Sequence, residues 1–344
     1  GSSATTNGYG TVDRWEMKYS GQDETPTQAT HELTSSDTGP WEKGFRNCWQ
    51  LTNGNQTSGA GAADMFYIRT RLEAQDVANS GWDYTSASSY ITISFWIKSS
   101  VAQAYYPYIK SEDGTAKYYF WSTGSLSADT WTKVTKTIPG VSGLQFDNNN
   151  AHGMDLVIPF FLGTDWTDNS ASVNTWANWD SGKRSVDQTS TFWTTNDADI
   201  EITGVQMEVG DSATDFEHRS YGEELTRCER YYEIICDAST GQPQQVLGVG
   251  DIYSSTDWGV TGNFRTRKRT ASISIEQTSN TDQWMTYSNG GTFKAGGPAD
   301  DWVTGDMNWG LRFDSSSNLN GSPTAGHSHR FRANATTAKI AFSA

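Results

Sequence analysis

Cysteine, proline and long apolar runs are all scarce in this sequence. Its 344 residues include only 3 cysteines and 8 prolines, and hydrophobic residues make up 35% of the chain. Cys48, Cys228 and Cys236 are too few for a disulfide framework, so we expect reduced thiols, as in a protein assembled in a reducing cytoplasm. No apolar run is as long as a membrane span and no signal peptide is evident, so membrane insertion is not expected.

Positive charge is also in short supply. The chain has 25 lysines and arginines against 40 aspartates and glutamates, which gives a formal net charge of −15 at pH 7. Such a chain repels phosphate, which argues against nucleic acid as a partner and against electrostatic attachment to anionic lipid. One basic run, Arg265–Arg269, is compatible with an acidic ligand, but a solvated strand face or a subunit contact explains it more simply.

The chain is rich in aromatic residues and in turn-forming residues. It has 15 tryptophans, 15 tyrosines, 14 phenylalanines and 33 glycines, a composition that suits many short strands with large buried side chains. Ile91–Lys98 alternates apolar and polar residues and is the clearest strand. An Asp-Gly turn between Tyr105–Lys110 and Ala116–Trp121 predicts a hairpin. Met154–Leu162 is apolar on both faces, which predicts a strand covered on both sides.

We call Ile200–Glu233 the organising segment, because it contains the expected boundary between two domains. Its first half alternates like a strand but changes phase, which predicts a β-bulge near Gly204. Ser220 and Glu223 then have the spacing of a capping box, which predicts the start of a short helix. We therefore expect an all-β protein with two antiparallel β-sandwich, jelly-roll-like domains, residues 1–222 and 223–344, joined by that helix.

Two further local expectations are weaker in pattern. Asp23–Gly39 is polar and turn-rich and is expected to be irregular. Thr191–Thr195 is expected to be a short strand that precedes the organising segment.

Tryptophans and polar side chains gather in the predicted loop Asp165–Ser181. Sugar rings stack their C–H faces on aromatic rings while neighbouring amides and carboxylates bind the hydroxyls. This loop therefore predicts a carbohydrate platform, which two tyrosines on one strand face would extend. The candidate residues are Trp166, Trp176, Trp179, Tyr106 and Tyr108. The competing interpretation is that these aromatic residues cover the edge of the sandwich or lie in a trimer contact.

The sequence offers no convincing catalytic or metal site. Asp165, Asp168 and Asp180 lie in the same loop, but nothing in their spacing selects the pair of carboxylates that glycoside hydrolysis requires. His327 and His329 share a strand face without a third ligand. The oxygen-rich run Asp147–Asn150 is compatible with a structural calcium ion. We predict no catalytic residues, no catalytic metal, no cofactor and no enzyme activity.

The organising segment also carries a family resemblance. ITGVQMEVGDSATDFEHRSYGEELTRCERYY, residues 202–232, resembles a junction in bacteriophage tail-fibre and other virion surface proteins, where a jelly roll similar to carbohydrate-binding modules ends. ISFWIKSS, TWTKVTKTIPG and NTWANWDSG, farther upstream, resemble that jelly roll. Asp215 and Ser220 stand where the family pattern usually has proline, so the turns at these two positions are left open.

The resemblance implies a non-enzymatic virion protein, a tail-fibre or capsid-fibre component, whose jelly roll binds a bacterial surface glycan during host attachment. It also implies contacts with other virion proteins and a homo-oligomer, with a trimer expected. An aromatic residue such as Trp96 on an otherwise polar strand face fits an oligomer contact. Two alternatives stay open: a capsid decoration or assembly protein that binds no sugar, and the accessory binding module of a secreted glycan-degrading enzyme.

Overall fold

The computed structural model confirms an all-β protein built from antiparallel sheets. It describes residues 4–238, 245–254, 257–278, 284–288, 291–294, 299, 301–314, 328–333 and 338–344. Contacts divide the chain into two compact units, Gly1–His218 and Arg219–Ala344. Among the described residues, every helix is too short, or not apolar enough, to cross a membrane.

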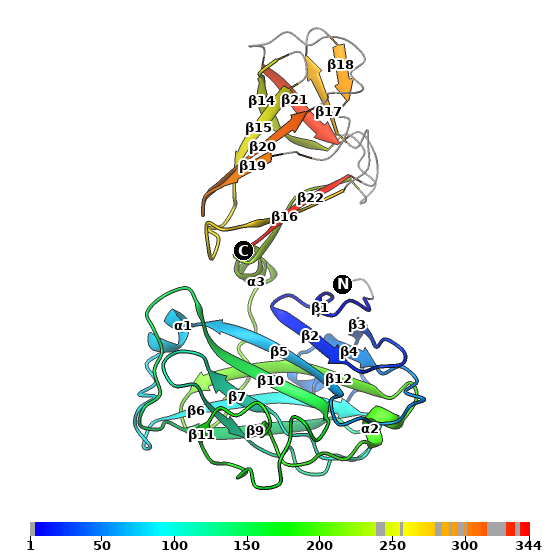
Figure 1. Cartoon of the computed structure of the whole chain (residues 1–344), viewed down its shortest axis with the longest axis vertical. Helices are drawn as coiled ribbons and strands as arrows, with labels where there is room; N and C mark the ends of the chain where they lie inside the picture. The colour runs from blue at the N-terminus through cyan, green and yellow to red at the C-terminus, as the bar shows by residue number, and fades with distance from the viewer. Residues whose placement is uncertain are drawn as a thin grey trace. The chain divides into compact units, whose positions relative to one another are not determined.

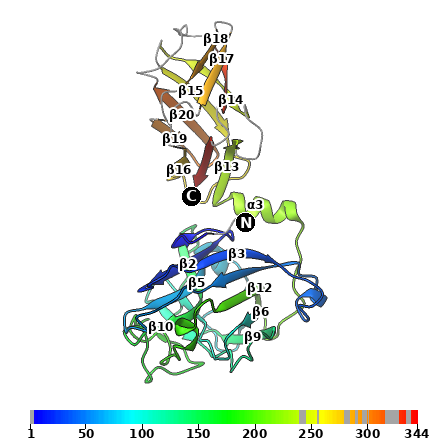
Figure 2. The ribbon, with the colours of Figure 1, turned by 90° about the vertical axis from the view of Figure 1, so that its right-hand side faces the viewer.

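The N-terminal unit is a sandwich of two sheets, drawn as two layers in Figures 1 and 2. The seven-stranded sheet has the order β1-β2-β5-β10-β7-β8-β11, and the five-stranded sheet has the order β3-β4-β12-β6-β9. The strands of the first sheet are β1 (Gly8–Tyr9), β2 (Trp15–Ser20), β5 (Met65–Glu73), β10 (His152–Leu162), β7 (Tyr108–Ser111), β8 (Lys117–Phe120) and β11 (Ala177–Asn178). Those of the second are β3 (Thr27–Glu32), β4 (Asn47–Thr52), β12 (Asp199–Val209), β6 (Tyr90–Ser99) and β9 (Thr132–Pro139).

Alternation along the strands builds the main core between the two sheets. Ile93, Phe95 and Ile97 of β6 are fully buried there, because successive residues of a strand point to opposite faces. Residues of β10 reach the same core from the opposite sheet, and Ile158 pairs with Ile68 of β5. The predicted strand Ile91–Lys98 is therefore correct, and its apolar face is the one that is buried.

Strand β10 is covered on both faces, as predicted. Met154, Leu156 and Ile158 face the main core, whereas Val157 and Leu162 belong to a second cluster on the outer face of the seven-stranded sheet. The neighbouring strands β7 and β8 form the expected antiparallel hairpin. Its turn glycine, Gly114, has φ +62°, a left-handed conformation that favours glycine.

The predicted bulge lies in β12. Its pairing with β6 shifts register between Thr203 and Gln206, and Gly204 has φ +63°. A Cβ atom at this position would lie 2.5 Å from Cζ of Phe45. Glycine is thus required here both by the backbone conformation and by the close approach of an aromatic ring.

Two local expectations are wrong. Thr191–Thr194 is a helical turn, α2, rather than a strand, because Phe192 and Trp193 are both buried in one core and adjacent residues of a strand would point to opposite faces. The polar stretch Asp23–Gly39 contains the edge strand β3. Its Gln28 is buried, and the side-chain oxygen accepts a hydrogen bond from Nε1 of Trp49 at 3.0 Å.

Trp96 is not an exposed aromatic residue on a polar face. It is half-buried in a cluster on the outer face of the five-stranded sheet with Phe45, Leu33 and Phe216. Thr92 and Ser94, on the same strand face, are buried as well. Trp96 therefore gives no support to an oligomer contact, and the homo-oligomer stays a prediction.

The C-terminal unit begins with helix α3 (Tyr221–Glu229) and continues as two antiparallel sheets. Both bonds of the predicted capping box are present, so Ser220 supplies a cap that a proline side chain does not offer. The sheets have the orders β13-β22-β16 and β18-β17-β21-β14-β15-β20-β19. Their strands are β13 (Tyr232–Asp237), β14 (Val246–Ile252), β15 (Asp257–Asn263), β16 (Ser274–Gln277), β17 (Trp284–Ser288), β18 (Gly291–Lys294), β19 (Asp301–Thr304), β20 (Asn308–Asp314), β21 (Ser328–Ala333) and β22 (Lys339–Ser343).

The basic run Arg265–Arg269 is largely neutralised within this unit. Lys268 is buried, and its Nζ lies 2.6 Å from a carboxylate oxygen of Glu233, which is also buried. Arg265 pairs with Glu229 at 2.9 Å, and Arg267 with Asp306 at 3.2 Å. The run therefore does not present a free basic patch to an acidic ligand.

All three cysteines are free thiols, as predicted.

Gly204→Ala should lower the free energy of unfolding of the N-terminal unit by about 2–4 kcal/mol, because the new methyl group combines backbone strain with overpacking against Phe45. Chemical denaturation followed by tryptophan fluorescence measures the change. Gly182→Ala is the control, since a Cβ there would meet atoms no nearer than 3.5 Å, and it should change stability by less than about 0.5 kcal/mol. Equal effects of the two substitutions would contradict the structural role of Gly204.

Candidate functional site

Four of the five predicted platform residues meet on the outer face of the seven-stranded sheet. Tyr108 is a buried member of the aromatic cluster there, and Tyr106, Trp166 and Trp179 pack against it half-buried. The ring of Trp179 lies 5.8 Å from the ring of Tyr108 and 5.6 Å from that of Tyr118. Tyr108 is only 3% exposed, so it supports the cluster and offers no ring face to a ligand.

Trp176, the fifth predicted residue, is not part of this outer aromatic cluster. It packs half-buried against the main core, its ring lies 5.5 Å from that of Tyr119, and its Nε1 donates a hydrogen bond to the carbonyl oxygen of Pro139 at 2.7 Å. Tyr119 points to the inner side of the sheet, whereas its neighbours Tyr118 and Phe120 point outward. The loop tryptophans are therefore divided between the two sides of the sheet.

Cations lie over the rings of the two outer tryptophans. The guanidinium carbon of Arg184 is 4.3 Å from the ring centre of Trp166 and 5.6 Å from that of Trp179. Nζ of Lys110 is 4.7 Å from the ring centre of Trp179. Because cation–π contacts orient both partners, this end of the face combines fixed aromatic rings with fixed hydrogen-bond donors.

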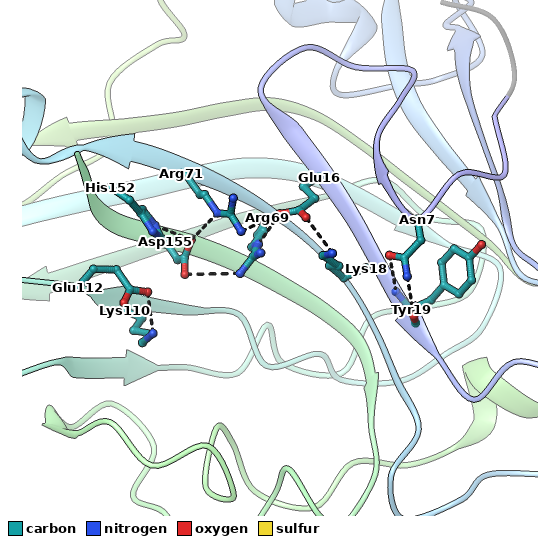
Figure 3. A network of polar contacts seen from close by, with 10 residues as sticks. All are labelled: Asn7, Glu16, Lys18, Tyr19, Arg69, Arg71, Lys110, Glu112, His152 and Asp155. Atoms are coloured by element: carbon teal, nitrogen blue, oxygen red, sulfur yellow. Dashed lines mark hydrogen bonds and ion pairs between the residues drawn. The ribbon is translucent and has the colours of Figure 1, made fainter. Parts of the chain in front are cut away.

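A network of ion pairs continues along the same sheet face, as Figure 3 shows. Nε of Arg69 lies 2.7 Å from Oε2 of Glu16, and Nη2 of Arg71 lies 3.2 Å from the same oxygen. Asp155 is hydrogen-bonded to His152 at 2.9 Å and lies 3.9 Å from Arg69. Cross-strand pairing brings these residues together, since Glu16 faces Arg69 and Asp155 faces Arg71 in the ladders of β2, β5 and β10.

The network holds its carboxylates in the ionised form. Burial by itself would raise the pKa of Glu16, but the hydrogen bond and charge of Arg69 lower it below its usual value. Burial likewise opposes ionisation of Asp155, and the contacts with His152 and Arg69 lower its pKa overall. A general acid needs a raised pKa so that it carries a proton near neutral pH. These two carboxylates are therefore suited to accepting hydrogen bonds, not to donating protons.

The sequence reasoning missed this network. The available signal was charge at alternate positions of two strands, Glu16 with Lys18 and Arg69 with Arg71, because such residues share one sheet face. The sequence alone did not show that β2 pairs with β5 and β5 with β10. These pairings connect residues more than 50 positions apart.

Asp168 and the histidine pair were the other candidates for chemistry. The pKa of Asp168 is lowered to about 2, mainly by hydrogen bonds from the backbone and hydroxyl of Ser170 and also by Lys183, which fits a loop-stabilising carboxylate. His329 is buried, and His327 lies outside the described residues.

The side chains of the predicted calcium run are held by hydrogen bonds within the protein, and a structural calcium ion there stays a prediction. Side-chain oxygens of Asp147, Asn148 and Asn149 each accept a hydrogen bond from a neighbouring N–H group.

Glu16→Gln should reduce the stability of the N-terminal unit at pH 7 by about 1.5–3 kcal/mol, the usual range for a hydrogen bond to a charged group. Because the folded-state pKa of Glu16 is lowered from its usual 4.5, its contribution is present above pH 4.5 and is lost as the pH falls below that value. The difference in unfolding free energy between wild type and variant should therefore shrink in acid. Glu32→Gln, at an exposed position of β3, is the control, and a pH-independent difference for Glu16→Gln would contradict the ion-pair interpretation.

Comparison with known proteins gives only distant similarities. No protein-family model matches the chain, and no curated protein matches its sequence. The chain is similar to the enzymatically active domain of tailspike protein 4 of bacteriophage CBA120, at 11% identity and a TM-score of 0.31; the match covers 57% of this chain and only 19% of that one. It is also similar to a family 11 carbohydrate-binding module from Clostridium thermocellum, solved with a β-1,3-1,4-mixed-linked tetrasaccharide (10% identity, TM-score 0.29, 59% of this chain and 93% of that one). A tandem pair of family 22 carbohydrate-binding modules from Paenibacillus barcinonensis matches at 10% identity and a TM-score of 0.27, over 95% of this chain and 91% of that one. TM-scores this low do not establish a shared fold, so they say nothing of the function of this chain.

Proposed function

We propose that this chain is a non-enzymatic component of a bacteriophage virion, of the tail-fibre or capsid-fibre type, whose N-terminal sandwich binds a bacterial surface glycan. The observation that carries the binding part is the outer face of the seven-stranded sheet. There a hydrogen-bonding ion-pair network lies on the same face as an aromatic cluster.

The chemistry of that face suits a sugar chain. Guanidinium groups donate paired hydrogen bonds, and carboxylates accept them, which matches neighbouring hydroxyls on a pyranose ring. The side chain of Arg71 is 38% exposed, whereas its partner Glu16 is buried. A ligand can therefore reach the guanidinium of Arg71 from solvent, while Glu16 holds that group in place. Half-buried Trp166 and Trp179 supply apolar surface for the C–H faces of the sugar.

The virion part of the proposal rests on the sequence resemblance of residues 202–232. The same resemblance supports other virion proteins as partners and a homo-oligomer, with a trimer expected. A decoration protein without sugar binding is the alternative if no glycan binds to the sheet face. An accessory module of a secreted enzyme is the alternative if a catalytic domain belongs to the same polypeptide.

Trp179→Ala should weaken binding to host-cell polysaccharide roughly tenfold, a loss of ~1.4 kcal/mol, because it removes a stacking surface from the sheet face. Trp176→Ala is the matched comparison, only three residues away. It should cost about 2–3 kcal/mol of stability, since its indole packs on the core, and leave the affinity unchanged while the protein is folded. Isothermal titration calorimetry with purified polysaccharide, together with melting curves, separates the two effects. Unchanged affinity for Trp179→Ala would remove the aromatic cluster from the proposed site, and weaker binding by folded Trp176→Ala would place the sugar elsewhere.

The purified chain should release no reducing ends from the polysaccharide that it binds. The reason is the ionised state of Glu16 and Asp155, two buried carboxylates of the sheet face. Incubation with host polysaccharide and a reducing-sugar assay test this expectation. Sugar release that disappears in Glu16→Gln or Asp155→Asn, with polysaccharide binding retained, would show an enzyme instead.

A further inference from the structure

A cavity of about 390 Å³ opens on the outer face of the five-stranded sheet, the opposite side of the sandwich from the proposed glycan face. Ser94 and Trp96 of β6 line it, together with Lys133 of β9 and Gly204 of β12. Trp96 and Lys133 are directly opposite each other in the β6–β9 ladder, so their side chains lie side by side on this sheet face.

The β12 bulge shapes the floor of this cavity. The backbone at Gly204 turns through a left-handed conformation, and the absent side chain leaves room for Phe45 against the sheet. The ring of Phe45 lies 4.8 Å from that of Phe216 and 5.1 Å from that of His218. The cavity therefore has aromatic surfaces both in the sheet and in the segments that cover it.

Hydrogen bonds to β12 and to Lys43 hold the covering segment, residues 214–218, in place. Thr214 donates from its backbone and its hydroxyl to Glu208, at 2.9 and 2.7 Å. The backbone N–H of Glu217 donates to Oε1 of Gln206 at 2.9 Å. His218 Nε2 is hydrogen-bonded to the carbonyl oxygen of Lys43 at 2.8 Å. These bonds make the cavity a preformed feature of the fold.

Two polar groups of the lining are available to a ligand. Within the described part of the chain, the Ser94 hydroxyl makes no hydrogen bond and the Lys133 ammonium makes no ion pair within 4 Å. Lys43 is already paired with Asp215 at 3.1 Å.

The lining carries as many carboxylates as ammonium groups. The carboxylates belong to Glu42 and Asp215, and the ammonium groups to Lys43 and Lys133. A balanced rim gives no net attraction to an anion or a cation, so it favours a neutral, hydroxyl-rich ligand.

We propose that this cavity binds a single neutral pyranose unit, such as the terminal residue of a glycan. Its size lies near the lower limit of ligand pockets, ~300–1,000 Å³, which suits one sugar ring better than an extended chain. Trp96 and Phe216 provide apolar surface for the C–H face, and Ser94, Lys133 and Asp215 provide donors and acceptors for hydroxyls. The glycan class rests on the proposed function, but the cavity is a separate site with separate residues.

The test uses the full chain and neutral monosaccharides: glucose, galactose, N-acetylglucosamine and rhamnose. Saturation-transfer difference NMR identifies a sugar that binds, and a titration gives its affinity. Lys133→Ala should weaken that binding by about tenfold or more, the loss of one directed polar contact, without changing the melting temperature. Lys136→Ala is the matched control, because Lys136 lies three residues away and its Nζ is 5.7 Å from the Tyr119 ring, away from the cavity.

Each outcome decides between the two sites. No monosaccharide binding by wild type, or equal binding by Lys133→Ala and Lys136→Ala, would overturn the cavity proposal. Loss of monosaccharide binding in Trp179→Ala, with retention in Lys133→Ala, would also overturn it and make the sheet face the sugar site. Retained monosaccharide binding in a Trp179→Ala variant that has lost polysaccharide binding would support the cavity as an independent site. Failure of polysaccharide binding alone would count only against the sheet face.

Discussion

The N-terminal unit depends on one strand, β10, being buried on both faces. Met154, Leu156 and Ile158 complete the core between the two sheets, while Val157 and Leu162 carry the aromatic cluster on the outer side. A strand in this position must hydrogen-bond on both edges as well, and β10 pairs with β5 on one side and β7 on the other. Because it is central in both respects, it aligns the ion-pair network of β2 and β5 with the aromatic residues of β7 and β8.

Asp155 is a buried carboxylate on this otherwise apolar strand, and its need for cationic partners explains why charged residues gather on the sheet face. A buried carboxylate is costly unless it is paired and hydrogen-bonded. His152, Arg69 and Arg71 surround it, and these arginines also hold Glu16. The same requirement explains the buried Lys268–Glu233 pair of the C-terminal unit. In each unit, cations of this acidic chain compensate a buried carboxylate.

The proposed sheet face and the cavity differ in the kind of ligand that they suit. The sheet face is open, lined by planar charged groups, and continues from the network to the aromatic cluster, which fits several units of a sugar chain. The cavity is small, balanced in charge and bounded on one side by residues 214–218, which fits one ring. The cavity also depends on the bulge at Gly204, which lies in the segment on which the virion proposal rests.

Local patterns were enough to predict the central strands β6 and β10, the hairpin at Gly114, the bulge at Gly204 and the capping box at Ser220, because each depends on alternation, turn chemistry or spacing within a few residues. The same patterns failed at Thr191–Thr194, where tertiary burial of two adjacent aromatic residues requires a helical turn, and at Trp96, whose cover comes from residues near Gly39 and Phe216. By itself the sequence determined the fold class, the acidic surface and the presence of aromatic and carboxylate groups. Only the tertiary structure decided that Trp176 packs on the core while Trp179 lies on the outer face, and that Glu16, Arg69 and Asp155 form one network. Such placements depend on which strands pair, and antiparallel pairing joins residues too far apart in the chain for any local pattern to connect.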